Sequence, residues 1–173
     1  DMIVCAGAPA TKWIANRDPE GDRASLERLV RALSAARCDE IVLISTIDVY
    51  PVLVGADETY DCRQGNNHAY GTNRLWLEER ARELFARCTI VRLPALYGPG
   101  LKKNVVFDLL NHNCLEAVQP SSWFQWYDVS RLWRDVELAR ASALSVVNLF
   151  PEPLPTKAIL DRCFRDVSVG SGA

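Results

Sequence analysis

The chain of 173 residues is 49% hydrophobic and 24% charged, with 20 basic and 22 acidic side chains and a formal net charge of -2. A chain of this length and composition can bury a core of its own as one ordinary soluble domain. Its basic residues are scattered, which argues against a nucleic-acid partner, and no apolar run approaches the roughly 18 residues of a membrane span.

The cysteines and histidines favour neither disulfides nor a metal site. Six cysteines are spread along the chain without a CxxC pair, and the two histidines are His68 and His112. This spacing indicates reduced, mostly packed thiols. The first residues also lack the basic segment of a signal peptide. We therefore expect a cytoplasmic protein without a bound metal.

The first two thirds of the chain alternate between apolar runs and helical patterns. Buried strands are predicted at residues 1–8, 40–45 and 89–93, because each is a short apolar run. Helices are predicted from Asp18-Pro19-Glu20 onward and over residues 70–87, where apolar side chains recur at helical spacing. This order predicts a Rossmann-like parallel α/β sheet with flanking helices.

The last third of the chain predicts a small α+β region. Helices are expected at residues 104–111 and 130–141, a strand at 146–149, and a last short helix capped by Thr156. The aromatic stretch of residues 123–127 is expected to be a loop. Its tryptophans, together with Trp133, are expected to pack in a core or an interface.

Polar residues at two predicted strand ends and at a helix start suggest a site. In open parallel sheets, ligands bind at the carboxyl ends of the strands. Tyr70 and Arg74 share a helix face, so we expect the guanidinium to lower the pKa of the phenol and make it a usable acid or base. Thr46, at the end of the preceding strand, offers a hydroxyl to a substrate oxygen. An isolated tyrosine is usually a packing residue, however, and Arg74 also fits a charged helix surface.

These segments resemble the extended short-chain dehydrogenase/reductases, the NAD-dependent epimerase/dehydratase family. Family members carry a strand ending in Ser/Thr-x-x-x-Tyr, then Tyr-x-x-x-Lys on a helix, then a strand ending near Tyr-Gly-Pro-Gly. The counterparts here are Ser45–Tyr50, Tyr70–Arg74 and Arg92–Gly100. Weaker matches are residues 1–8, which resemble the family's fourth strand, Tyr127-Asp128-Val129, and Asn148.

The resemblance implies hydride transfer with NAD or NADP as the cofactor. In this reading Tyr70 is the general acid/base, Thr46 orients the substrate carbonyl or hydroxyl, and Arg74 assists. The implied cofactor contacts are Ala6, Gly7, Ser45, Tyr70, Arg74 and Pro94. The implied substrate contacts are Thr46, Asp48, Lys102 and Lys103. Paired lysines are more often a solvated surface.

Three departures from the family pattern bear on the activity. Arg74 stands where the family has lysine, and a guanidinium cannot lose its proton. Ile47-Asp48 replaces the Asp-Glu of sugar-nucleotide dehydratases, and Ser121-Ser122-Trp123 lacks the arginine that grips a diphosphate. An oxidoreductase acting on a sugar nucleotide or another hydroxyl or carbonyl substrate is favoured over a dehydratase. The alternative is a non-catalytic relative that binds a metabolite, a nucleotide or a protein partner.

None of the nine glycines forms the glycine-rich turn that the family uses for the cofactor pyrophosphate. By the resemblance, residues 1–100 are the C-terminal half of a Rossmann-like domain that is N-terminally truncated. Residues 101–173 are then a substrate-binding region interleaved with the last strands and helices. The first strand would present an open edge, so we expect a longer polypeptide, a homodimer, or pairing with a separate N-terminal segment.

Overall fold

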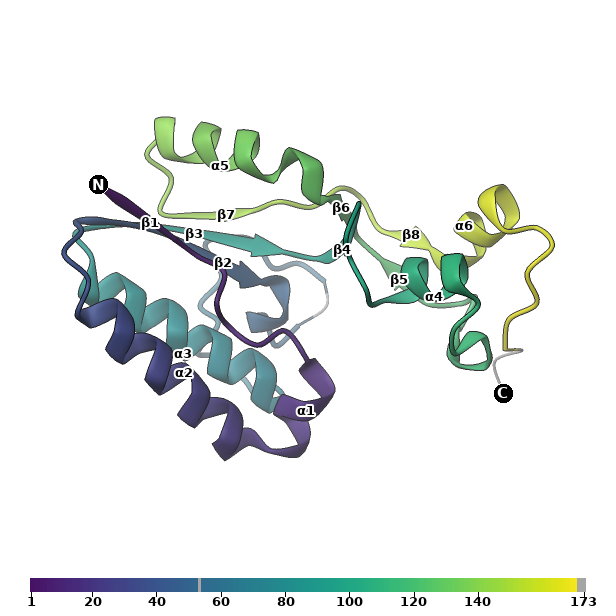
Figure 1. The fold of residues 1–173 in the computed structure, drawn as a ribbon, viewed down its shortest axis with the longest axis horizontal. Coiled ribbons are helices and arrows are strands. Elements are labelled where there is room, and N and C mark those ends of the chain that lie inside the picture. Colours follow the sequence, from purple (N-terminus) through teal and green to yellow (C-terminus); the bar gives the residue numbers. More distant parts are fainter. Residues whose placement is uncertain (53, 171–173) are drawn as a thin grey trace. The chain divides into compact units, whose positions relative to one another are not determined.

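In a computed structural model, the described residues are 1–52 and 54–170, and they form two compact units (Figure 1). Unit 1 contains Asp1–Leu93 and Val136–Asn148. Unit 2 contains Pro94–Asp135 and the described residues from Leu149 on. Within the described ranges, no helix is long and apolar enough to cross a membrane.

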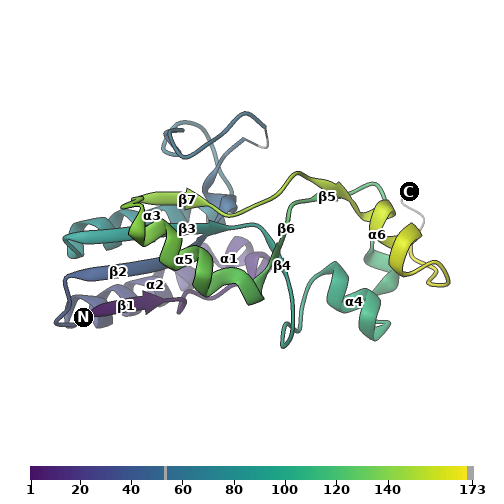
Figure 2. The same cartoon turned by 90° about the horizontal axis from the view of Figure 1, so that it is seen from above.

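Unit 1 is built on a parallel sheet, which in the described residues has four strands in the order β1-β2-β3-β7 (Figures 1 and 2). The strands are β1 (Met2–Cys5), β2 (Glu40–Thr46), β3 (Arg87–Leu93) and β7 (Val146–Asn148). The register pairs Val4 with Val42, and Val42 in turn with Thr89. Helices connect β1 to β2 and β2 to β3, as parallel neighbours require. The predicted Rossmann-like α/β fold is confirmed.

Two long helices, α2 (Pro19–Ser34) and α3 (Ala69–Leu84), lie side by side on one face of the sheet (Figure 1). The side chain of Asp18 accepts a hydrogen bond from the Gly21 amide and caps α2, as the Asp-Pro-Glu sequence predicted. Helix α5 (Leu132–Ala141) buries Val136 and Ala139 and lies on the opposite face. The short helix α1 (Lys12–Arg17) was not predicted, because six residues carry too little periodicity.

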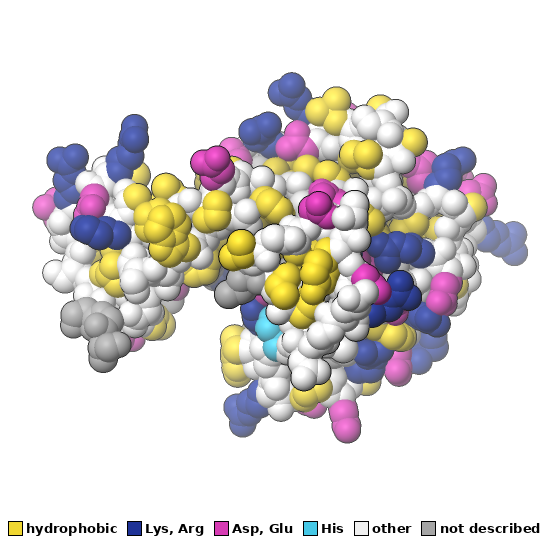
Figure 3. Space-filling view, turned by 180° about the vertical axis from the view of Figure 1, so that it is seen from behind, with side chains coloured by type: hydrophobic (Ala, Val, Ile, Leu, Met, Phe, Trp, Pro, Cys, Tyr) yellow, Lys and Arg dark blue, Asp and Glu magenta, His cyan; other side chains and the backbone are white. Residues whose placement is uncertain are grey.

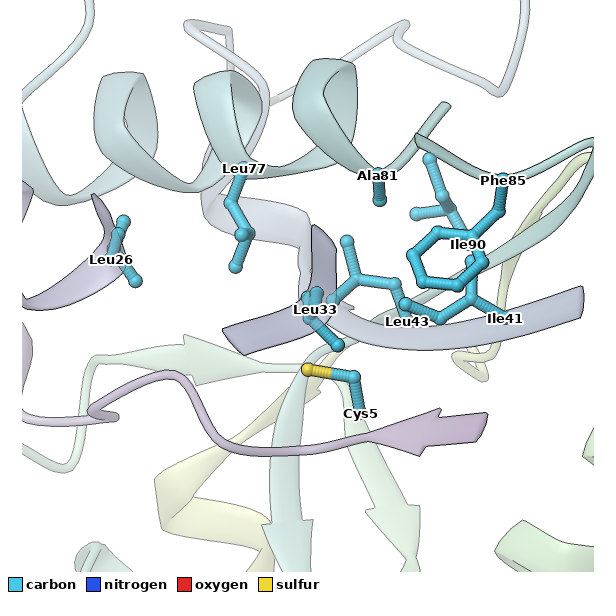
Figure 4. Packing of buried hydrophobic residues seen from close by; sticks show 9 residues of the cluster. All are labelled: Cys5, Leu26, Leu33, Ile41, Leu43, Leu77, Ala81, Phe85 and Ile90. Atoms are coloured by element: carbon cyan, nitrogen blue, oxygen red, sulfur yellow. The ribbon is translucent and has the colours of Figure 1, made fainter. Parts of the chain in front are cut away.

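The core of unit 1 lies between β1, β2 and β3 and the helices α2 and α3 (Figure 4). Residues at helical spacing meet alternate strand residues there, so each element contributes one face. The cluster consists of Cys5, Leu26, Leu33, Ile41, Leu43, Leu77, Ala81, Phe85 and Ile90. Each fully buried leucine or isoleucine in it stabilises the fold by about 1.5–3 kcal/mol.

Unit 2 combines short strands with short helices. Strand β4 (Ala95–Tyr97) pairs in parallel with β6 (Trp126–Asp128), and β5 (Trp123–Phe124) pairs antiparallel with β8 (Leu154–Pro155). Its helices are α4 (Val105–Asn111) and α6 (Thr156–Cys163). Turns of 3-10 helix are Leu115–Ala117 and Val129–Arg131.

Three expectations for unit 2 were wrong. The aromatic stretch forms strands rather than a loop, because pairing with β4 and β8 supplies hydrogen bonds that local sequence cannot show. Trp126 is buried, but Trp123 is 64% exposed and Trp133 is also exposed, so the packing prediction holds for Trp126 alone. Thr156 is the first residue of α6 and makes no capping hydrogen bond; Pro155 stands at the cap.

The six cysteines are free thiols, as expected. Cys5 and Cys62 are buried and Cys38 and Cys88 are half-buried, whereas Cys114 and Cys163 are exposed. Packing therefore explains four of them. On the face shown in Figure 3, basic and acidic side chains are interspersed, in keeping with their distribution along the sequence.

Candidate active site at the end of strand β2

Thr46 shapes the turn that follows β2. Its hydroxyl oxygen accepts a hydrogen bond of 3.1 Å from the Asp48 amide and donates to the Asp48 carboxylate over 3.4 Å. The turn continues as a 3-10 helix, η1 (Ile47–Val49). The hydroxyl predicted to meet a substrate oxygen therefore lies at the carboxyl end of a parallel strand. Only a long, weak bond engages its proton.

The first turn of α3 packs directly against η1. A Cβ atom on Gly71 would overlap the Asp48 carbonyl oxygen and the Asn67 side chain, so only glycine allows this approach. Asn67 donates from its side-chain nitrogen to the carbonyl oxygens of Asp48 and Val49, at 2.9 and 3.1 Å. These contacts hold Tyr70, the neighbour of Gly71, beside the turn that carries Thr46.

Tyr70 is 8% exposed, and its ring lies near the side chains of Arg74 and His68. The Arg74 Cζ atom is 4.3 Å from the ring centroid on one side, and the His68 ring is 6.3 Å away. Burial raises the pKa of the phenol and outweighs the lowering effect of Arg74. The expected net lowering of the Tyr70 pKa was therefore wrong, because desolvation was left out of it. The phenol is protonated at neutral pH.

Arg74 is buried, at 3% exposed, so it is not part of a charged helix surface. Its terminal nitrogens donate to both carboxylate oxygens of Asp22, at 2.9 and 3.0 Å, and to the Pro9 carbonyl oxygen. Burial opposes ionisation of Asp22, yet Arg74 and Asn73 hold the pKa of that carboxyl below its usual range. Arg74 is thus a structural cation that joins α3, α2 and the loop after β1.

A second charged group lies on the exposed side of the turn. The Asp48 carboxylate accepts a hydrogen bond of 2.5 Å from the Lys12 ammonium, and His68 Nε2 lies 3.5 Å from the same oxygen. His68 Nδ1 accepts the Gly71 amide hydrogen, so its proton belongs on Nε2, facing Asp48. Besides the Thr46 hydroxyl, the Asp48 carboxylate therefore has the Lys12 ammonium and the His68 Nε2 atom as neighbours.

Behind the site, a buried ion pair joins α3 to β3. Glu78 is fully buried and accepts two hydrogen bonds from Arg92, at 3.0 and 2.7 Å. Ser45, an expected cofactor contact, donates instead to Glu78 over 2.6 Å. Arg92 also donates to the Tyr50 hydroxyl, to which Asn148 donates as well. This network ties the ends of β2, β3 and β7 together.

The remaining expected site residues lie at strand ends or in unit 2. Ala6 and Gly7 follow β1 and are exposed. Pro94 begins unit 2, in which Lys102 and Lys103 are exposed. Within that unit, Lys103 lines a hollow of about 460 Å³ next to the Tyr97–Gly100 turn and α4.

Sequence reasoning missed several residues of this region. Asp22 gave a usable signal, since it lies four residues before Leu26 on the apolar stripe of α2, where an acid needs a buried partner. Glu78 likewise follows Leu77 on the buried face of α3. Lys12 gave no signal, because its role depends on a contact with Asp48, 36 residues away. His68 lies next to the predicted site in the sequence, but a single histidine in a polar loop is more often solvated.

No protein-family model matches the chain, and no curated protein matches its sequence. Solved structures do match its fold. A double mutant of the dTDP-glucose 4,6-dehydratase from Streptomyces venezuelae, with NAD bound, gives a TM-score of 0.73 at 17% identity and covers 93% of this chain and 56% of that one. RMD from Pseudomonas aeruginosa, complexed with NADPH, also gives 0.73 at 17% identity, covering 93% and 62%.

A third matching structure is that of an epimerase. The UDP-glucose 4-epimerase from Thermotoga maritima, with UDP-glucose, gives a TM-score of 0.70 at 17% identity and covers 98% of this chain and 63% of that one. The chain thus spans 56% to 63% of the length of these three structures. At this identity the matches establish the fold alone.

Proposed function

We propose that the chain is part of an NAD(P)-dependent oxidoreductase of the epimerase/dehydratase type. The observation that carries the proposal is the packing of Gly71 on the Asp48 carbonyl, which sets Tyr70 beside the Thr46 turn at a parallel strand end. Open α/β folds bind ligands at the carboxyl ends of their parallel strands. Structures with the same fold are solved with NAD, NADPH or UDP-glucose.

In this proposal Tyr70 moves the proton and Thr46 orients the substrate. The raised pKa keeps the phenol protonated, so Tyr70 donates its proton to a substrate carbonyl oxygen during reduction. Thr46 exchanges its weak bond to Asp48 for one to the same substrate oxygen. The nicotinamide, when bound, supplies the hydride to the carbonyl carbon, and the reverse steps oxidise an alcohol.

The residues at the end of β1 fit a cofactor better than those on α3 do. Ala6 and Gly7 are small and exposed, so a nucleotide can approach their backbone. The terminal nitrogens of Arg74 are committed to Asp22 and Pro9, and the hydroxyl of Ser45 to Glu78. We therefore propose that Arg74 positions Tyr70 rather than contacting the cofactor. Pro94 remains a proposed contact of the nicotinamide.

The substrate contacts proposed in unit 1 are Thr46 and Asp48. Lys12 and His68 surround the Asp48 carboxylate and can exchange it for a polar substrate group. In unit 2, Lys103, which lines the hollow by α4, and its neighbour Lys102 offer positive charge to a sugar nucleotide or another polar substrate. We propose that the pair in unit 1 and the lysines in unit 2 each contribute to substrate binding independently.

The free edge of β1 offers a place for a nucleotide-binding half. In the described part of the sheet β1 pairs with β2 alone, and Val4 is 44% exposed on it. An open edge of a parallel sheet accepts a further strand. We propose that such a strand comes from an N-terminal segment of the same polypeptide, with a separate chain or a second copy as the other outcomes.

The test uses the chain together with any upstream coding sequence. NAD and NADP are titrated against intrinsic tryptophan fluorescence, and UDP-glucose and dTDP-glucose serve as probe substrates, with reduced nicotinamide followed by absorbance. The Tyr70→Phe variant should bind the cofactor and keep the circular dichroism of the parent, yet lose turnover by a factor of about 100 or more. Full activity in this variant would overturn the proposal.

A second function is supported by Arg74. Because that arginine is paired with Asp22, it does not stand free as the family's lysine would, which favours a non-catalytic relative that still binds a ligand at the strand ends. Such a protein would bind the nucleotide in the same titration and show no turnover with either probe. Turnover that depends on Tyr70 would exclude this alternative.

A further inference from the structure

Unit 1 contains two buried arginines that each lie against a tyrosine ring and are each gripped by a carboxylate. In the first set Asp22 holds Arg74, whose Cζ atom is 4.3 Å from the centre of the Tyr70 ring. In the second set Glu78 holds Arg92, whose Cζ atom is 4.8 Å from the centre of the Tyr50 ring. The two sets share helix α3 and provide an internal comparison.

The two arginines meet their tyrosines differently. Arg92 donates a hydrogen bond of 2.7 Å to the Tyr50 hydroxyl. Arg74 uses Nη1 and Nη2 for Asp22, and Nη2 also for the Pro9 carbonyl, while its buried Nε has no partner among the described residues. The guanidinium carbon of Arg74 lies over the Tyr70 ring.

We propose that Asp22 is a positioning residue for Tyr70: its two hydrogen bonds hold the guanidinium of Arg74 over the phenol ring and balance its charge. A guanidinium fork matches a carboxylate in this way, whereas a lysine ammonium cannot make the same paired contact. The proposal therefore gives a reason for arginine at position 74 that does not require it to touch a cofactor.

The grip is itself braced by neighbouring polar groups. Asn73 donates to Asp22 over 2.8 Å and to the Pro19 carbonyl over 3.1 Å. Arg23 in turn donates to the Asn73 side-chain oxygen over 2.9 Å. The carboxylate of Asp22 thus has three donors from α3, which leaves it little freedom to release Arg74.

Four charged or titratable groups face Tyr70 from the surrounding elements. They are Arg74 on α3, Asp22 on α2, Asp48 in η1, and His68 before α3. Burial raises the pKa of Tyr70 most, the negative charges of Asp48 and Asp22 raise it further, and Arg74 lowers it. Removing the charge of Asp22 leaves Arg74 unbalanced, so the pKa of Tyr70 should fall.

The experiment titrates the tyrosines themselves in the whole chain, without cofactor or substrate. The five tyrosines are replaced by 3-fluorotyrosine, which lowers the intrinsic phenol pKa, and are followed by fluorine NMR after assignment by single Tyr→Phe variants. In Asp22→Asn the Tyr70 resonance should titrate about one unit lower, a shift typical of a neighbouring charge, while Tyr50 should not move. Asp22→Glu, which restores the charge, should return Tyr70 toward its original value.

Glu78→Gln is the matched control. It weakens the buried pair of Glu78 and Arg92, whose carboxylate lies on the same helix as Tyr70, roughly 12 Å along it at 1.5 Å per residue. In this variant the Tyr50 titration should move and that of Tyr70 should stay. An unchanged Tyr70 titration in folded Asp22→Asn, or an equal shift in Glu78→Gln, would overturn the proposal.

A second measurement covers the case in which Asp22→Asn does not fold. In the fluorotyrosine-labelled chain that keeps Asp22, the fluorine resonance of Tyr70 should change in acid as Asp22 takes up its proton, at a pH below the usual range of a carboxyl group. A Tyr70 resonance that stays fixed until the chain unfolds contradicts the proposal.

Only the consequence for turnover rests on the proposed function: the pH profile of Asp22→Asn should shift in the same direction as the Tyr70 titration. Inactivity of the parent chain would refute the function and leave the titration result standing.

Discussion

Gly71 is the residue of the candidate site at which a side chain has no space. Its Cα faces the Asp48 carbonyl oxygen and the Asn67 side chain at distances that exclude a Cβ atom. The requirement comes from the approach of two backbones, since Gly71 lies within a regular helix. The position of Tyr70 relative to the Thr46 turn therefore depends on a neighbour without a side chain.

Gly71→Ala should push the first turn of α3 away from η1. We expect a loss of about 1–3 kcal/mol in the free energy of unfolding, the usual cost of overpacking, together with weaker turnover or ligand binding. Urea unfolding followed by circular dichroism measures the first effect. Thr72→Ala, an exposed position in the same turn, is the control and should change stability by no more than about 0.5 kcal/mol. Equal stability of Gly71→Ala and the parent would contradict the close approach.

Asp22 makes the stability of the chain depend on pH. Its pKa in the folded chain is lowered, by Arg74 and Asn73 against the effect of burial, from the ordinary 3.8. A carboxyl of this kind contributes stability above its unfolded pKa and loses the contribution as pH falls through the folded pKa. Asp22→Asn lacks this contribution at every pH.

We therefore expect the stability difference between the parent and Asp22→Asn to be largest at neutral pH, at about 3–5 kcal/mol, because one partner of a buried ion pair is removed. The difference should shrink as the pH falls below about 4. Urea unfolding at a series of pH values measures it. A difference that is independent of pH would show that the charge of Asp22 is not what stabilises the pair.

At the scale of elements, the buried pair of Glu78 and Arg92 connects α3 to β3. Ser45 adds a hydrogen bond from β2, so the Glu78 carboxylate on α3 is bonded to both β2 and β3. Burial opposes the charge of Arg92, but its bonds to Glu78 raise the pKa of Arg92 above the ordinary value. Arg92 is therefore charged, and its contacts with Glu78 connect the helix to the sheet.

Glu78→Ala should lower the free energy of unfolding by about 3–5 kcal/mol, because it leaves the buried charge of Arg92 without its partner. Replacing both residues by methionine should recover most of the loss, since a buried ion pair contributes little beyond what apolar packing provides. Glu83→Gln removes an exposed carboxylate on the same helix and should cost less than about 1 kcal/mol. Thermal unfolding ranks the variants, and equal effects of Glu78→Ala and Glu83→Gln would refute this account.

The sequence predicted the long elements well because their signals are local. Asp18 and Pro19 mark the start of α2, and the spacing of Leu77 and Ala81 marks the inner face of α3. It failed for strands β5 and β8, two residues each, which exist only through their pairing. In the site, Tyr70 and Thr46 could be nominated from motif spacing, whereas the roles of Lys12 and His68 follow from contacts across dozens of residues.

At the scale of the whole molecule, the sheet of unit 1 is unequal at its two edges. In the described residues β7 forms one edge and β1 the other, and β1 presents an apolar run with Val4 exposed. Parallel sheets are normally covered on both faces, and native proteins protect open edges. The chain spans 56% to 63% of the length of the three matched structures.

Val4→Lys places a charge on this edge and should discourage any strand from pairing with it. For the 173-residue chain alone we expect self-association at micromolar concentration, and we expect Val4→Lys to shift the population toward monomer in sedimentation velocity. Val52→Lys changes an exposed valine outside the sheet and should leave the association unchanged. In a polypeptide that also carries a nucleotide-binding half, Val4→Lys should instead weaken NAD or NADP binding, because the added strand would no longer dock beside Ala6 and Gly7. Association that is equal in the two lysine variants would show that β1 is not the contact, and the proposed place for the nucleotide-binding half would then be wrong.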